Sequence, residues 1–174
     1  DKIAFAYKGD IYVVDAEGGQ ARQITTNSSY DSNPIWSNDG KYIAFSTDRN
    51  ANFDIYIVSV DGGVAKRVTT NSTSEIPLAF SADDSMIYYR ANIQRDADNA
   101  QFPAGWTREL YKVSVNGGRP QQVVATNVCS ISFDNDNESF LYYDEKGGED
   151  EWRKHQISSM ARDIVYYDAK EKTH

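Results

Sequence analysis

A short β-type segment that opens with an acidic residue occurs four times along the 174 residues of the chain. A Gly-Gly pair follows each of the first three copies, and another short β-type run follows each pair. The leading acids are 44, 55 and 54 residues apart, in the segments Asp10–Asp15, Asp54–Ser59, Glu109–Ser114 and Asp163–Asp168. A repeat of this length predicts a solenoid, a propeller or another array of similar units.

A second pattern precedes the first in three of the four units. It consists of two β-type runs joined by a turn rich in Asp, Asn or Gly, and its copies are Pro34–Ser46, Leu78–Tyr89 and Ile131–Tyr143. Two β-type runs around a short polar turn are typical of a β-hairpin. One full unit is therefore expected to hold four short antiparallel strands.

Several of these runs, such as Ile11–Val14 and Ile55–Val58, are apolar at consecutive positions. Continuous apolarity indicates a sheet that is covered on both faces, as a blade between two neighbours is. We therefore expect an all-β fold: a β-propeller fragment of four-stranded antiparallel blades, about three and a half blades in extent. The first unit lacks an opening strand and the fourth lacks a last one, so the expected units are 1–28 (partial), 29–72, 73–127 and 128–174 (partial).

Composition argues against several classes of function. The 26 acidic and 18 basic residues give a formal charge of −8, which is unfavourable for binding nucleic acid. The single cysteine, Cys129, excludes an internal disulfide and a thiolate metal cluster, and its apolar surroundings predict a buried side chain. No apolar run approaches the ~18 residues that a membrane-spanning helix needs.

Few residues are candidates for catalysis or metal binding. Of the two histidines, only His155 is not terminal, and a hydrolase acting within this chain would have to use it. The acidic run Asp134–Glu138, with Glu145, resembles a calcium loop, but the repeat places it at a hairpin turn, which favours a solvated turn. We expect no catalytic residue, no cofactor and no metal site in this chain.

Two insertions interrupt the repeat, at Asn92–Trp106 and Glu145–Ala161. Loops of this length are often functional. Large aromatic side chains in polar loops either anchor contacts with a partner or pack on the rim of their own domain. The candidate interaction residues are Trp106, Trp152, Arg153, Lys154 and His155.

The repeat resembles one that is found in a known class of propellers. The segment from Pro34 through Ser46 to Asp54–Thr69, with Trp36, Gly40 and the Gly62-Gly63 pair, resembles the TolB-like propeller repeat. The resemblance covers nearly the whole chain and implies the fold, a protein-binding role and an extracytoplasmic location. Propellers of this type are attached to many different partners, so the repeat does not select one function.

A narrower resemblance lies in Tyr143–Ile164, which is similar to a segment of the amino-terminal propeller of tricorn-like serine peptidases. Gln156 and Val165 stand where that family would have His and Trp. No Arg-Arg pair of the kind that anchors peptide carboxyl ends is present, and Lys66-Arg67 is expected in an outer strand.

This resemblance implies a non-catalytic domain that serves assembly, or controls the access of peptides to an active site downstream in the parent chain. The expected partners are proteins or peptides, other domains of the parent chain and further copies in an oligomer, with no nucleic acid and no membrane span. The alternative is a TolB-like protein-interaction module with no peptidase activity.

Overall fold

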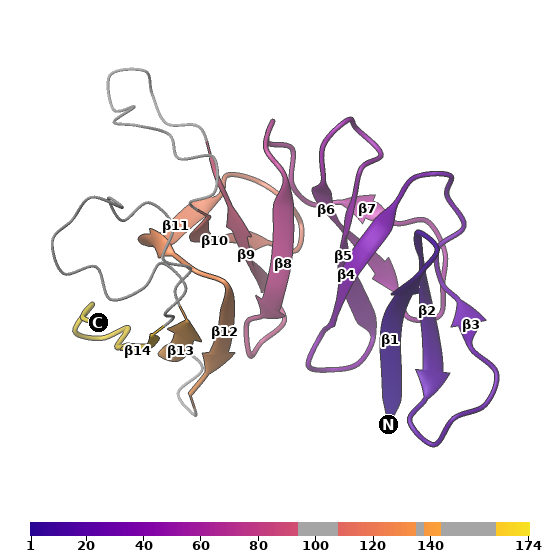
Figure 1. Ribbon diagram of the computed structural model, residues 1–174, viewed down its shortest axis with the longest axis horizontal. Helices are drawn as coiled ribbons and strands as arrows, with labels where there is room; N and C mark the ends of the chain where they lie inside the picture. The colour runs from indigo at the N-terminus through magenta and orange to yellow at the C-terminus, as the bar shows by residue number, and fades with distance from the viewer. Residues whose placement is uncertain (94–107, 135–137, 144–162) are drawn as a thin grey trace, which may run out of the picture.

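The chain folds into antiparallel β-sheets that follow one another in chain order. The computed structural model describes residues 1–93, 108–134, 138–143 and 163–174. Within these ranges all the secondary-structure elements are β-strands. Figure 1 shows the four sheets side by side, from β1–β3 near the N-terminus to β12–β14 near the C-terminus. No helix in the described part of the chain is long and apolar enough to cross a membrane.

We call the four sheets blades 1 to 4. Blade 1 holds β1 (Lys2–Tyr7), β2 (Asp10–Asp15) and β3 (Arg22–Gln23). Blade 2 holds β4 (Asp31–Trp36), β5 (Tyr42–Thr47), β6 (Asp54–Ser59) and β7 (Lys66–Arg67). Blade 3 holds β8 (Glu75–Phe80), β9 (Met86–Ala91), β10 (Glu109–Ser114) and β11 (Gln121–Asn127). Blade 4 holds β12 (Ser130–Phe133), β13 (Phe140–Tyr143) and β14 (Ile164–Tyr167).

The predicted fold class is confirmed, and within the described residues the successive blades hold three, four, four and three strands, as expected. Two of the fourth strands, β3 and β7, are shorter than the sequence suggests, since they have only two residues each. The reason is that a threonine hydroxyl, rather than a backbone carbonyl, accepts one hydrogen bond of the β-ladder in each of these blades. The Oγ1 atoms of Thr25 and Thr69 accept hydrogen bonds from the backbone N–H groups of Ile11 and Ile55, at 2.9 and 2.8 Å.

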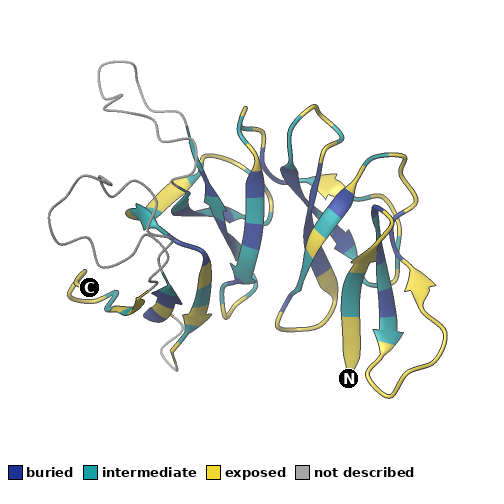
Figure 2. Ribbon diagram, in the orientation of Figure 1, coloured by how far each residue is buried: buried dark blue, intermediate teal, exposed yellow. Residues whose placement is uncertain are grey.

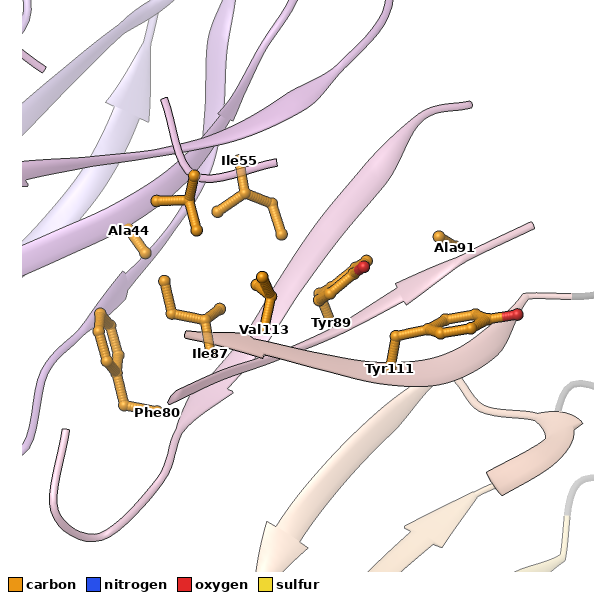
Figure 3. Close-up of a cluster of buried hydrophobic side chains, with 9 residues drawn as sticks. Ala44, Ile55, Phe80, Ile87, Tyr89, Ala91, Tyr111 and Val113 are labelled. Atoms are coloured by element: carbon orange, nitrogen blue, oxygen red, sulfur yellow. The ribbon is translucent and has the colours of Figure 1, made fainter. Parts of the chain in front are cut away.

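Apolar side chains fill the space between neighbouring blades. Strand β5 is buried at five consecutive positions, Ile43–Thr47, as expected for a sheet covered on both faces. Figure 2 shows this burial running through the middle of the molecule. Figure 3 shows one cluster, in which Ala44 and Ile55 of blade 2 meet Phe80, Ile87, Tyr89, Tyr111 and Val113 of blade 3. Similar clusters join blade 1 to blade 2 and blade 3 to blade 4.

The first strands of the blades lie against one another. Strand β4 contacts β8, and β8 contacts β12. First strands that meet in this way mark the inner side of the arc, so the fourth strands β7 and β11 are outer strands. Lys66 and Arg67 therefore lie in an outer strand, as predicted.

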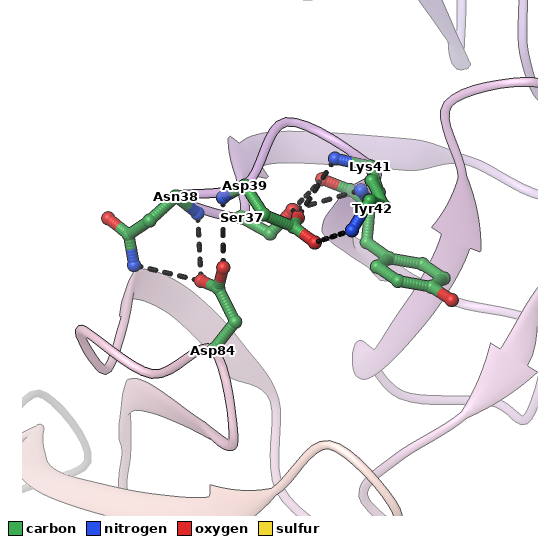
Figure 4. A network of polar contacts seen from close by, with 6 residues as sticks. All are labelled: Ser37, Asn38, Asp39, Lys41, Tyr42 and Asp84. Carbon is green, nitrogen blue, oxygen red and sulfur yellow. Dashed lines mark hydrogen bonds and ion pairs between the residues drawn. The ribbon is translucent and has the colours of Figure 1, made fainter.

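The hairpin turns of blades 2 and 3 interlock at one edge of the blades (Figure 4). The Asp84 carboxylate accepts hydrogen bonds from the backbone N–H groups of Asn38 and Asp39, at 2.8 and 2.9 Å, and from the Asn38 amide at 2.8 Å. Asp84 holds a left-handed conformation (φ 56°), as Gly40 does in the turn of blade 2 (φ 70°). A hydrogen bond from the backbone N–H of Lys41, with help from its side chain, lowers the pKa of Asp39 to about 2. This edge is thus held by contacts between turns.

Candidate functional site: the polar edge of the blades

The opposite edge of the blades carries buried acidic side chains. At this edge the first strands begin, the second strands end and the third strands begin. We call it the polar edge and define it by Asp10, Asp31, Asp54, Glu75 and Glu109, the residues that open β2, β4, β6, β8 and β10. The side chains of Asp31, Asp54 and Glu75 are fully buried. Burying a carboxylate is costly unless it is paired or protonated, so the partners of these three decide what the edge can do.

Asp31 and Asp54 each have an arginine partner. The Arg49 Nη2 atom lies 3.0 Å from Oδ2 of Asp31, and the Arg67 Nη2 atom lies 2.8 Å from Oδ2 of Asp54. Burial raises the pKa of Asp54, and the Arg67 guanidinium opposes that effect. Both acids thus keep a nearby positive charge that offsets part of the cost of burial.

Glu75 occupies the position in blade 3 that Asp31 occupies in blade 2. The backbone N–H groups of Asp31 and Glu75 donate to the carbonyl oxygens of Gly9 and Phe53, each just before the third strand of the preceding blade. The residue that corresponds to Arg49, by the shared 44-residue spacing, is Ile93. Glu75 therefore lacks the arginine that pairs with Asp31.

The Glu75 carboxyl relies on weaker partners. Its Oε1 atom accepts a hydrogen bond from the Asn71 amide at 2.5 Å, while its buried Oε2 atom has no hydrogen-bond partner. The pKa of Glu75 is raised to about 7, mainly by burial and also by the negative charge of Asp54, while the neighbouring Thr69 and Asn71 side chains oppose the rise. The carboxyl thus gains and loses its proton near neutral pH, inside the interface between blades 2 and 3.

In blade 3 the acid that opens the third strand has neutral partners in place of an arginine. Glu109, which opens β10, accepts hydrogen bonds from the Tyr111 hydroxyl at 2.6 Å and the Gln122 amide at 2.5 Å. The N–H of Val128 donates to the carbonyl oxygen of Arg108, just before β10, so Val128 holds the place of Asp31 and Glu75. It is fully buried. The same position is thus acidic in blades 2 and 3 and apolar in blade 4.

The two insertions predicted from the sequence join the polar edge. One connects the end of β9 at Ala91 with the start of β10 at Glu109, and the other connects β13 at Tyr143 with β14 at Ile164. The candidate interaction residues, listed from the sequence as Trp106, Trp152, Arg153, Lys154 and His155, lie outside the described residues. The centre of the acidic run at 135–137 and Glu145 also lie outside them.

Other sequence candidates do lie in the described part of the chain. Cys129 is buried, as predicted. The terminal His174 packs edge-on against Tyr142, and its Nδ1 atom lies 2.9 Å from the Tyr142 hydroxyl. Among the described residues, no group of three or more His, Cys, Asp or Glu side chains is placed to hold a metal ion.

Sequence reasoning missed the buried acids, although a signal for them was present. The run from Thr25 to Asp31 returns 44 residues later as the run from Thr69 to Glu75, with Asn27 and Asn71 in the same place. This second repeat marks the connection between the fourth strand of one blade and the first strand of the next. In blades 2 and 3 it identifies the acid that follows this connection at the polar edge.

Comparison with known proteins gives the family. The tricorn protease N-terminal β-propeller domain matches residues 1–174, the whole chain. The chain belongs to this family. No curated protein matches.

Solved structures share the fold at low sequence identity. TolB from Acinetobacter baumannii has a TM-score of 0.73 at 16% identity, covering 99% of this chain and 40% of that one. The putative TolB from Agrobacterium tumefaciens has a TM-score of 0.60 at 23% identity, covering 82% of this chain and 49% of that one. The tricorn protease has a TM-score of 0.66 at 15% identity, covering 95% of this chain and 20% of that one. The chain thus spans less than half the length of each of these relatives, and the likeness concerns the fold.

Proposed function

We propose that this chain is the non-catalytic propeller domain of a tricorn-like peptidase, where it serves assembly or controls the access of peptides to an active site elsewhere in the polypeptide. The observation that carries this proposal is the match of the tricorn N-terminal propeller family to residues 1–174. An extracytoplasmic location and a serine peptidase as the parent protein are parts of the same proposal.

The polar edge is the surface on which we place the contact with peptides. At this edge the ion pairs of Asp31 and Asp54 tie down the first residues of β4 and β6. Both long connections, between β9 and β10 and between β13 and β14, join the same edge. Binding residues commonly sit on loops that a rigid scaffold positions. Trp106 and Trp152, one in each connection, are the side chains that we propose as anchors.

The first test measures peptide turnover by the parent peptidase with and without residues 1–174. Control of access predicts that removal of the propeller changes the ratio of turnover between long and short peptides. An unchanged ratio, with no peptide bound by the intact protein, contradicts the gating role.

The second test locates the contact. Trp152→Ala is expected to weaken peptide binding about tenfold, because truncation of an anchoring aromatic costs on the order of 1–2 kcal/mol. The matched control is Val64→Ala, since Val64 is 99% exposed in the turn between β6 and β7, at the edge opposite the polar edge. Equal binding by the two variants contradicts the placement at the polar edge.

The alternative function is a TolB-like interaction module with no peptidase attached. The likeness to TolB over 99% of this chain favours it, but that likeness concerns the fold alone. The coding sequence that follows residue 174 separates the two proposals. A catalytic serine domain supports the first, and its absence supports the second.

A further inference from the structure

The interface of blades 2 and 3 contains two buried oxygen atoms that have no hydrogen-bond partner among the described residues. They are Oε2 of Glu75, which opens β8, and the hydroxyl oxygen of Tyr89 in β9. Both side chains are fully buried. A buried polar atom without a partner costs free energy, so two of them at one interface require a physical explanation.

The two oxygen atoms belong to the same end of the interface. Pro77, two residues after Glu75, pairs with Tyr89 across β8 and β9. The Tyr89 ring lies on the face of blade 3 that packs against Ala44 and Ile55 of blade 2 (Figure 3). Burial raises the pKa of Tyr89, and the negative charge of Glu75 raises it further, so the hydroxyl lies within electrostatic reach of the carboxyl.

The interface of blades 1 and 2 shows what lies between an acid and a ring at these positions. There the acid is Asp31 and the ring is Phe45, each 44 residues before its counterpart in blade 3. The Arg49 guanidinium lies 5.6 Å from the centre of the Phe45 ring and 3.0 Å from Oδ2 of Asp31. Blade 3 has Ile93 in place of this arginine, and its ring carries a hydroxyl oxygen instead. The acid and the ring are thus kept, while the side chain that supplies the positive charge is not.

We propose that a monovalent metal ion, Na⁺ or K⁺, binds in the interface of blades 2 and 3 between the Glu75 carboxylate and the Tyr89 hydroxyl, in the place that an arginine takes one blade earlier. Hard cations prefer oxygen ligands, and both groups supply them. The local charge favours a single positive charge, because Glu75 and Asp54 carry two negative charges and Arg67 carries one positive charge. Divalent ions are usually bound by several carboxylates, and the described residues hold no group of three or more His, Cys, Asp or Glu side chains for a metal.

The proton and the metal ion compete for the same carboxylate. The pKa of Glu75 is about 7, so the ion is expected to bind above neutral pH and to be displaced in acid. The charged groups that face the carboxylate are Asp54 of β6 and Arg67 of β7. The Tyr89 hydroxyl of β9 also faces it, and stays protonated because its pKa is raised. The bound ion therefore offsets part of the cost of ionising Glu75.

The first experiment measures urea unfolding of the 174-residue chain at pH 8 in NaCl, KCl or N-methylglucamine chloride at equal ionic strength. Na⁺ or K⁺ is expected to lower the unfolding equilibrium constant about tenfold for each tenfold rise in its concentration above the dissociation constant. The bulky organic cation is the control for screening. At pH 4 the three salts are expected to give equal stability, because Glu75 then holds its proton. Equal stability in the three salts at pH 8 overturns the proposal.

Single substitutions locate the ion by the same assay. Glu75→Gln is expected to remove the difference between the salts, and Glu17→Gln, at an exposed position, is the matched control that keeps it. Ile93→Arg supplies the guanidinium that blade 2 has and is expected to abolish the dependence on Na⁺ or K⁺. A salt difference that survives in Glu75→Gln overturns the proposal.

Tyr89→Phe tests the second ligand without removing the carboxylate. It copies the ring that fills this position in blade 2, so it also serves where Glu75→Gln does not fold. The expected result is a rise of about tenfold in the dissociation constant of the ion, because one oxygen contact with a charged group is lost. An unchanged dissociation constant overturns the placement of the ion between Glu75 and Tyr89.

Discussion

Glu75 makes the stability of this protein depend on pH in a direction that can be derived from the structure. Burial is the main cause that raises the pKa of its carboxyl from 4.5 to about 7 in the folded chain. Between these two values the unfolded chain has lost the proton while the folded chain still holds it. The free energy of unfolding therefore falls as pH rises through this window.

The size of the effect follows from the size of the shift. One pKa unit corresponds to ~1.4 kcal/mol, so a shift from 4.5 to about 7 corresponds to about 3 kcal/mol. This stability is present below pH 4.5, where both states hold the proton, and is lost above pH 7. The charged groups that face the carboxyl are Asp54 of β6 and Arg67 of β7, with the Tyr89 hydroxyl of β9 nearby.

Glu75→Gln removes the titration and keeps the shape of the side chain. The expected result is that the free energy of unfolding of the wild type, relative to this variant, falls by about 3 kcal/mol between pH 4.5 and pH 8. Urea unfolding at several pH values, followed by circular dichroism, measures the difference. Glu17→Gln, in an exposed turn, controls for the change of net charge. Parallel pH profiles of the wild type and Glu75→Gln would refute the reasoning.

Three further substitutions test the contacts within and between blades by the same unfolding assay. Arg67→Met leaves buried Asp54 without its cation. It is expected to destabilise the protein by about 3 kcal/mol at pH 8, and by less at pH 4 because the raised pKa of Asp54 favours its protonated form there. An equal loss of stability at both pH values contradicts this expectation. Phe45→Ala empties a fully buried site at the interface of blades 1 and 2 and is expected to cost about 3–5 kcal/mol, whereas a cost below about 1 kcal/mol would mean that this interface is loose. Asp84→Ala loses the hydrogen bonds from Asn38 and keeps the left-handed backbone, so it is expected to be about 1 kcal/mol less stable than Asp84→Gly, which relieves the backbone.

The blade pattern could be predicted because it is written in local sequence. Apolar β-type runs, polar hairpin turns and Gly-Gly pairs each specify a strand or a turn without reference to distant residues. Gly62 and Gly63, for example, adopt φ values of +93° and +114°, which residues with a Cβ rarely adopt. Three such signals in a fixed order, repeated along the chain, were enough to predict the blades and their strand number.

The polar edge could not be read in the same way, because sequence does not distinguish a buried carboxylate from a solvated one. Asp15 and Asp54 both flank strands of the same repeat, yet Asp15 is exposed and Asp54 is fully buried. The difference arises from the packing of the next blade against the start of β6. The short lengths of β3 and β7 were missed because they also depend on a side chain. The hydroxyls of Thr25 and Thr69, rather than backbone carbonyls, accept hydrogen bonds from the neighbouring strands β2 and β6.

The departures from the repeat at the polar edge separate what the fold requires from what it only tolerates. One position is Asp31 with an arginine, Glu75 without one, and Val128 with no charge at all. Since Val128 fills this position and is fully buried, an acid there is not needed to form a blade. Glu75 nevertheless carries a cost of about 3 kcal/mol above pH 7, worked from its raised pKa. A costly group that the fold does not need therefore stands at the edge that both long connections join, inside the interface of blades 2 and 3.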